Sequence, residues 1–226
     1  MSAPLLSIHG LCKSYTQHLH GGRSLAVLRG AELELEAGTC TVVRGPSGSG
    51  KSSLLRCVYR SALADSGEIV LRALGRELDL VAASEREILE VRRTMVGMAT
   101  QFLWVVPRVS ALSLVEGCGL ERAAAQTLLA RLGLEPELHE LPPATFSGGQ
   151  RQMLNLALTL ARPRPLLLLD EATASLDPQR RRMALASLLE RKRAGTAILA
   201  VFHDLPAFPG LVDRVVQVRD GRLLAA

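Results

Sequence analysis

The chain has 226 residues, of which 48% are apolar and only 3% are aromatic. This length can bury a sizeable core as one domain with a smaller lobe, and the composition predicts an aliphatic core. The longest apolar run beside a predicted strand, residues 166–169, is far too short to cross a bilayer, and the N-terminus lacks the pattern of a secretory signal. We therefore expect a cytoplasmic protein.

Charge and cysteine usage argue against a nucleic-acid-binding protein and against a protein held by disulfides or a cysteine-bound metal. The net charge of +5 could suit nucleic acid, but the run Arg180, Arg181, Arg182 falls on a predicted exposed helix without interleaved aromatic residues for base stacking. A solvated face, or a patch for an acidic partner protein, explains the run better. The four cysteines are scattered without a C-x-x-C pair, which favours reduced thiols over disulfides or metal ligands.

The N-terminal part of the chain predicts strands. Three segments with strand-like apolar patterns could form an antiparallel edge sheet: residues 5–11, 25–28 and 33–36. A β-branched strand follows at residues 39–43, and the sequence from Ser53 onward is typical of a helix.

Between this strand and this helix lies a glycine-rich segment that fits the pattern G-x-x-x-x-G-K-[ST]. Glycines let backbone N–H groups converge on phosphate oxygens, and the helix N-terminus adds its positive dipole. Lys51 supplies a charge for the β- and γ-phosphates, and Ser52 offers a hydroxyl to Mg²⁺. The strand–loop–helix setting favours a triphosphate site over an ordinary turn. The predicted binding residues are Gly45, Pro46, Ser47, Gly48, Ser49, Gly50, Lys51, Ser52 and Ser53.

The rest of the chain alternates strands and helices around a helical insertion. Predicted strands cover residues 68–71, 95–99, 166–169, 197–202 and 214–218. Predicted helices cover residues 84–93, with a Ser84-x-x-Glu87 capping box, then 112–134, 147–160, with Ser147 as the N-cap, and 178–193. This order predicts an α/β protein of one domain, 1–226. Residues 1–100 and 163–226 form its nucleotide-binding core, and residues 101–162 form a helical subdomain.

Two acids follow the apolar strand at residues 166–169. Ligands of open α/β sheets bind at the carboxyl ends of the strands, which is where Asp170 and Glu171 would lie. We expect Asp170 to hold Mg²⁺ and Glu171 to polarise the attacking water. Acids after a strand can merely cap a turn, but beside a phosphate loop the catalytic interpretation is favoured.

A second anion-binding helix N-terminus is predicted at Ser147, Gly148, Gly149 and Gln150, although such a segment alone is usually only a cap. In chain order, all these motifs resemble the complete set of an ATP-binding cassette (ABC) ATPase. The resemblance covers essentially the whole chain. It implies a P-loop fold with a parallel core sheet, an antiparallel N-terminal β part and an inserted helical subdomain. It also implies Mg²⁺-dependent ATP hydrolysis in a head-to-tail dimer, where residues 147–150 contact the partner's ATP.

The same resemblance implies roles for four further residues. Gln101 resembles the loop glutamine that senses Mg²⁺ and the attacking water, and His203 resembles the switch histidine at the γ-phosphate. Asp177 resembles the aspartate that communicates across the dimer, and Tyr15 the aromatic residue that stacks on adenine. Tyr15 alone could equally be a packing residue, and an isolated histidine is usually structural. The place of His203 directly after a predicted strand favours the switch role.

Finer details resemble the L subunit of the phosphonate carbon–phosphorus lyase system. They lie at residues 58–59, 78–81, 88–93, 100–112, 145–149 and 202–204. This resemblance implies that ATP turnover is coupled to the lyase complex, with the same or a related cassette as dimer partner.

The chain also departs from the family pattern. Ala172 replaces a common proline, and residues 115–134 are short for a lobe that receives membrane subunits in transporters. The alternative function is the cytosolic ATPase of a transporter of the lipoprotein- or peptide-export type, with only indirect membrane contact. A third possibility is a nucleotide-switched binding module, but the complete set of Lys51, Asp170, Glu171 and His203 argues against an inactive site.

Overall fold

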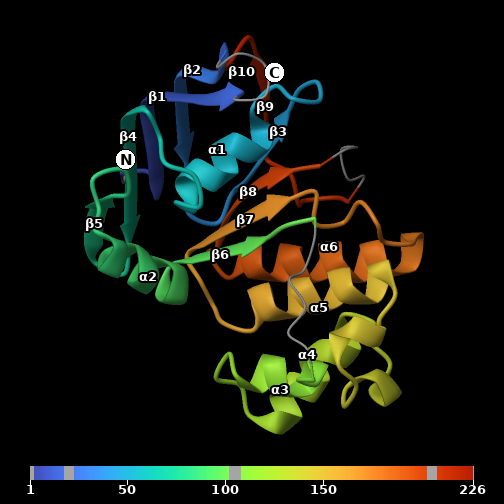
Figure 1. The fold of residues 1–226 in the computed structure, drawn as a ribbon. Helices are drawn as coiled ribbons and strands as arrows, with labels where there is room; N and C mark the ends of the chain where they lie inside the picture. Colours follow the sequence, from blue (N-terminus) through green and yellow to red (C-terminus); the bar gives the residue numbers. More distant parts are fainter. Residues whose placement is uncertain (1–2, 18–22, 102–107, 203–207, 226) are drawn as a thin grey trace.

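The fold consists of two sheets with helical segments packed between them and on the outer face of the larger sheet (Figure 1). The computed structural model describes residues 3–17, 23–101, 108–202 and 208–225. Its strands are β1 (Leu6–Gln17), β2 (Arg23–Leu35), β3 (Cys40–Arg44), β4 (Ser66–Ala73), β5 (Arg76–Asp79), β6 (Val96–Ala99), β7 (Leu166–Asp170), β8 (Ala197–Val201), β9 (Arg214–Arg219) and β10 (Arg222–Ala225). Its helices are α1 (Lys51–Val58), α2 (Glu85–Thr94), α3 (Ala111–Glu116), α4 (Arg122–Arg131), α5 (Gly148–Leu160) and α6 (Pro178–Arg193), with 3₁₀ turns η2 (Pro136–Leu138) and η3 (Pro143–Thr145).

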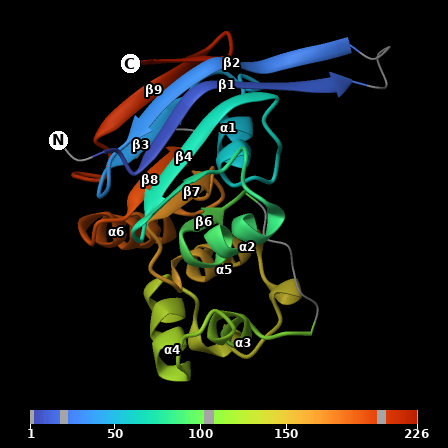
Figure 2. The ribbon, with the colours of Figure 1, turned by 90° about the vertical axis from the view of Figure 1, so that its left-hand side faces the viewer.

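The smaller sheet is antiparallel, in the order β2-β1-β4-β5. β1 and β2 extend together beyond the rest of the sheet (Figure 2). The sequence predicts two strands in the β2 region, whereas the structure has one, because pairing with β1 continues across the intervening polar residues. The register shifts between Ile8 and Leu11, where Gly10 has a φ angle of 57°, and again between Leu11 and Lys13, opposite Gly30 of β2, whose φ angle is 69°. Such glycines allow a bulge without ending the strand.

The larger sheet has the order β10-β9-β3-β8-β7-β6 and is parallel except for the β9–β10 pair. Its central strands β3, β7 and β8 are mainly apolar on both faces because both faces are covered. On β7, for example, Leu166 and Leu168 enter the core shared with the smaller sheet, while Leu167 and Leu169 enter the core under the outer helices. This arrangement confirms the predicted α/β class.

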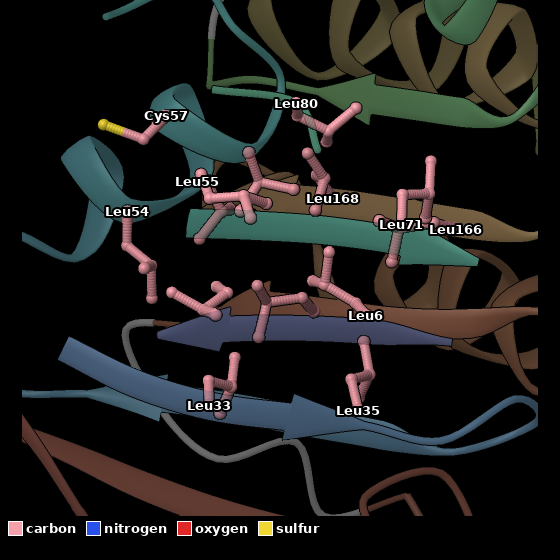
Figure 3. Packing of buried hydrophobic residues seen from close by; sticks show 14 of the residues in the cluster. Leu6, Leu33, Leu35, Leu54, Leu55, Cys57, Leu71, Leu80, Leu166 and Leu168 are labelled. Carbon is pink, nitrogen blue, oxygen red and sulfur yellow. The ribbon is translucent and has the colours of Figure 1, made fainter. Parts of the chain in front are cut away.

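Helix α1 lies between the two sheets and fixes the loop that precedes it. Its residues Leu54 and Leu55 are fully buried and pack with leucines of β1, β4 and β7 (Figure 3). Burial of each such leucine stabilises the fold by about 1.5–3 kcal/mol. The position of the phosphate loop is therefore set by the main core and not by its own contacts alone.

Helices α5 and α6 cover the opposite face of the larger sheet, and α3 and α4 lie beyond them (Figure 1). The single helix predicted over residues 112–134 is wrong. α3 ends at Glu116 with Gly117 as its C-cap, and Gly119 has a φ angle of 91°, so the chain turns before α4 begins. The high helix propensity of the flanking residues does not compensate for two glycines so close together.

Strands β5 and β10 are absent from the sequence prediction, and each follows a tight hairpin. Both central residues of these hairpins have positive φ: Leu74 and Gly75 at 54° and 72°, Asp220 and Gly221 at 52° and 78°. Turns of this type match the twist of the flanking strands. Asp-Gly is a recognised signal for such a turn, whereas leucine at its first central position is not.

None of the helices in the described parts of the chain is long and apolar enough to cross a membrane. All four cysteines are free. Burial raises the pKa of Cys40 to about 12 and that of Cys57 to about 11, so both thiols stay protonated and unreactive at neutral pH. Free, protonated cysteines agree with the reduced thiols that the sequence predicts.

Candidate active site

The phosphate loop connects β3 to α1, and two of its glycines cannot be replaced without a clash. Gly50 has a φ angle of 105°, and a Cβ atom there would lie 2.4 Å from the Val27 carbonyl oxygen of β2. A Cβ atom on Gly45 would lie 2.8 Å from both Ser49 Oγ and the Val218 carbonyl oxygen. The loop thus packs directly against the backbones of β2 and β9, and only glycine allows such close contacts.

Lys51 and Ser49 carry polar groups suited to an anion. Lys51 Nζ donates hydrogen bonds to the carbonyl oxygens of Gly45 (2.9 Å) and Pro46 (2.8 Å). Ser49 Oγ is buried and has no hydrogen-bond partner within the described part of the chain. A phosphate oxygen can accept a hydrogen bond from the Lys51 ammonium group in place of the loop carbonyls. It can also accept one from the Ser49 hydroxyl, which otherwise lacks a partner among the described residues. These residues fit a bound triphosphate.

Ser52 and Asp170 meet although they lie on different elements. Ser52 is in the first turn of α1, Asp170 is the last residue of β7, and Ser52 Oγ donates to Asp170 Oδ1 over 2.8 Å. Asp170 is only 7% exposed. A hydroxyl and a buried carboxylate that converge in this way are oxygen donors of the kind that Mg²⁺ prefers. The donor set therefore fits the metal that the sequence predicts.

Strand pairing brings other predicted residues to the same edge of the sheet. Ala99 of β6 pairs with Leu169 of β7, so Gln101 and Glu171 each lie two residues beyond paired positions. Glu171 has a φ angle of 53°, which is unusual for a residue other than glycine and costs on the order of 1–3 kcal/mol. Its N–H donates to the Val201 carbonyl at 3.0 Å, which fixes the turn against β8. His203 lies outside the described residues.

The turns beside Gln101 and Glu171 are held by two buried side chains, Gln152 and Asn155. Neither of them was singled out in the sequence analysis. Gln152 Nε2 donates to the carbonyl oxygens of Thr100 (3.0 Å) and Ala172 (2.8 Å). Asn155 Nδ2 donates to the same Thr100 oxygen at 2.7 Å. Ala172, where the family pattern has proline, is fully buried, and its carbonyl is held by this bond. The available signal was spacing, since Gln152, Asn155 and Thr159 form a polar stripe on an otherwise apolar helix.

Tyr15 lies on the extended part of β1 and is 38% exposed. It pairs with Leu25 on β2, two residues from Val27, whose carbonyl contacts the phosphate loop. Lys13 Nζ lies 5.0 Å from the centre of its ring, and Asp65 accepts hydrogen bonds from Ser14 N (2.6 Å) and Ser14 Oγ (2.5 Å). An exposed ring is therefore held close to the loop.

The predicted second anion site lies apart from the phosphate loop. Ser147 is the N-cap of α5, as predicted, and it also forms a capping box with Gln150. No hydrogen bond within the described segments joins residues 147–150 to the phosphate loop, and a Cβ atom on Gly149 would instead lie 3.6 Å from the Ser175 carbonyl oxygen. The described residues therefore do not join the two predicted anion sites into one.

Asp177 has its carboxylate engaged within the chain. It caps α6 by accepting from the N–H groups of Gln179 (3.0 Å) and Arg180 (2.9 Å). These backbone bonds, led by that of Arg180, lower the pKa of Asp177. Arg180 also pairs with Glu135 at 2.8 Å, whereas Arg181 and Arg182 are exposed. Part of the arginine run therefore joins α6 to the segment after α4.

A phosphate loop, a converging hydroxyl–carboxylate pair and a parallel sheet define a P-loop nucleotide-binding protein. A family model described as ABC transporter matches residues 28–174. The chain belongs to this family of ATP-binding cassettes. It is an ABC ATPase that uses ATP, with Mg²⁺ as the metal general to the family.

Individual relatives are transporter components. The chain is 35% identical over 233 residues to the lipoprotein-releasing system ATP-binding protein LolD of Ruegeria sp., covering 99% of both proteins. It is 34% identical over 234 residues to a probable export ATP-binding/permease protein of Pseudomonas fluorescens, covering 100% of this chain and 34% of that protein. The macrolide export ATP-binding/permease protein MacB of Sodalis glossinidius is 33% identical, with coverages of 100% and 34%. The chain thus spans about a third of the length of the export/permease relatives.

The fold has close counterparts among solved structures. The dimeric structure of MJ0796, a bacterial ABC transporter cassette, has a TM-score of 0.85 and 24% identity, covering 96% of both chains. The structure of the same cassette bound to ADP and Pi has a TM-score of 0.84 and 23% identity, again covering 96% of both chains. These similarities confirm the predicted fold. The names of the sequence relatives above concern export and lipoprotein release, and they lend no support to the resemblance to a carbon–phosphorus lyase subunit.

Proposed function

We propose that this chain is the ATP-hydrolysing motor subunit of a larger assembly, and that the assembly is a membrane export or lipoprotein-releasing system. The observation that carries the catalytic part is the 2.8 Å bond between Ser52 and Asp170, directly beside the constrained Glu171. This bond supports a single site at the edge of the sheet for the groups that we propose to serve phosphate, metal and water. The names of the relatives support the transport part.

Each predicted residue has a role in this proposal. Lys51 and the loop N–H groups bind the phosphates, while Ser52, Asp170 and Gln101 serve the metal, which neutralises phosphate charge when bound. The Glu171 carboxylate accepts a proton from water as the water oxygen bonds to the γ-phosphorus and the bond to the ADP oxygen breaks. Tyr15 stacks on adenine, and His203 contacts the γ-phosphate.

The remaining predicted residues act between two copies. Residues 147–150 of one cassette contact the triphosphate held by its partner, and Asp177 communicates across the interface. The exposure of Ala174 and Ser175 beside Gly149 supports a partner-facing surface there. We propose residues 101–162 as the helical subdomain that receives the driven partner, with the cassette on the cytoplasmic side of the membrane.

A second candidate is an ATPase subunit of the phosphonate carbon–phosphorus lyase system. The sequence details at residues 100–112 and 145–149 support it, whereas the short helices α3 and α4, of six and ten residues, weigh equally on contacts with membrane subunits and with lyase subunits. Under this candidate the partner proteins would be lyase subunits instead of a permease.

Two measurements test the proposal. In Glu171→Gln, steady-state ATP turnover should fall by about 10²-fold or more while ATP binding persists, because only the proton acceptor is lost. Unchanged turnover would remove Glu171 as the base. Affinity purification of the wild-type chain from its native cells should recover a multispanning membrane protein. Recovery of lyase subunits would instead establish the second candidate.

A further inference from the structure

Helix α5 places three buried polar side chains on the face that it turns toward the larger sheet. Gln152, Asn155 and Thr159 are 2%, 7% and 5% exposed. Their spacing of three and four residues puts them on one side of a helix. All three donate to backbone carbonyls near the carboxyl edge of the sheet, where β6 and β7 end.

The carbonyls that accept the Gln152 and Asn155 bonds lie just beyond the ends of two strands. Thr100 follows the last residue of β6, which is an edge strand, and Ala172 lies beyond the last residue of β7. Ala172 is fully buried and lies outside the strands of the described residues, and its carbonyl accepts the bond from Gln152. A buried carbonyl without a donor costs about 1–3 kcal/mol.

The bonds are concentrated at two points of the chain. Thr100 immediately precedes Gln101, and Ala172 immediately follows Glu171. The amide of Gln152 bridges the two carbonyls with its two N–H donors, at 3.0 and 2.8 Å, and Asn155 adds a 2.7 Å bond to the first. Ser147, which caps the same helix, lies less than two turns before Gln152. One rigid helix therefore connects the Ser147 segment to both turns.

We infer that Gln152 and Asn155 are positioning residues that couple the Ser147 end of α5 to the turns carrying Gln101 and Glu171. The inference rests on the functions proposed above for Ser147, Gln101 and Glu171. A shift of α5 when a partner's phosphate binds Ser147 is transmitted to both carbonyls through these amides. The coupling is reciprocal, so ATP bound at Gln101 and Glu171 also orients Ser147 toward the partner.

Gln152→Met and Asn155→Leu test the inference, because each keeps side-chain volume and removes the donors. We expect either variant to lower kcat by about 10- to 100-fold through misplacement of Gln101 and Glu171. ATP affinity should stay within about 2-fold, since Lys51 and the loop are untouched. Thr159→Val is the matched control. It loses bonds of the same kind to the Met98 (3.2 Å) and Asn155 (2.9 Å) carbonyls, farther from the catalytic turns. The Tm of Thr159→Val should fall by about as much as that of Gln152→Met or Asn155→Leu, while its kcat should stay at the wild-type value.

A double-mutant cycle separates positioning from general structure. If Gln152 acts through Gln101, Gln152→Met should lower kcat less in a Gln101→Ala background than in the wild type. Additive effects, or equal losses of kcat in Gln152→Met and Thr159→Val, would overturn the inference. Asn155→Leu provides the same comparison if Gln152→Met does not fold. Wild-type turnover in these variants, with Glu171→Gln inactive, would overturn this inference alone and leave the proposed function intact.

Discussion

Gly50 shows, at the scale of one residue, how closely the phosphate loop is packed. Its φ angle of 105° disfavours any L side chain, and a Cβ atom would overlap the Val27 carbonyl oxygen at 2.4 Å. We expect Gly50→Ala to lower the free energy of unfolding by about 3 kcal/mol or more and to abolish ATP binding, because strain and overlap add. Urea unfolding and nucleotide titration measure both effects.

Gly75→Ala is the control for backbone strain alone. Gly75 has a φ angle of 72°, but a Cβ atom there would meet nothing within 4 Å. Its substitution should cost only about 1–2 kcal/mol and leave ATP binding unchanged. If both alanine variants lose the same stability, the overlap with Val27 contributes nothing.

Asp65 gives a prediction about pH. Hydrogen bonds from Ser14, above all from its hydroxyl, lower the pKa of Asp65 from its usual 3.8. A lowered pKa in the folded state adds stability above pH 3.8, and this stability is lost as the pH falls through the folded value. Asp65→Asn should therefore cost up to about 1 kcal/mol at pH 7, a small amount because the group is exposed, and less near pH 3. Thermal unfolding across this range measures the difference, and a cost independent of pH contradicts the assignment.

At the scale of elements, two helices carry the same capping box in different places. Ser84 and Glu87 cap α2, and Ser147 and Gln150 cap α5. Ser84→Ala and Ser147→Ala should each lower the free energy of unfolding by about 1 kcal/mol, because each loses one cap. Only Ser147→Ala should also lower ATP turnover. Equal turnover in the two variants would mean that Ser147 is a cap and nothing more.

Local rules allowed the capping box of α2 and the N-cap of α5 to be predicted, and the limits of these rules explain where prediction failed. A capping box or phosphate loop is specified by residues that are neighbours in sequence, so α2, α5 and the Lys51 loop were predicted within a residue or two of their bounds. The continuity of β2 depends on pairing with β1, and the bonds of Gln152 depend on the approach of α5 to β6. Contacts between distant segments leave only weak signals in one sequence.

For the whole molecule, the layered fold separates the two predicted halves of the nucleotide site. The phosphate loop lies between the sheets at β3 and α1, whereas residues 147–150 begin a helix on the outer face of the larger sheet (Figure 1). Within the described residues, hydrogen bonds do not connect them. In the proposed head-to-tail dimer a single chain holds one half of each of two sites, so ATP turnover per chain should rise with protein concentration and level off once dimers predominate.

Complementation between inactive variants tests this geometry most directly. Glu171→Gln keeps Ser147 but loses the base, and Ser147→Ala keeps the base but loses the partner contact. In a head-to-tail mixed dimer, the phosphate loop and Glu171 of one variant face the intact Ser147 of the other, so one of the two sites is complete. Random pairing of equal amounts makes half the dimers mixed and should restore about a quarter of wild-type turnover. If mixing the variants restores no turnover and the wild type is fully active as a monomer, the site is not shared between two chains. A wild type that is inactive at every concentration indicates that its partner is a different cassette.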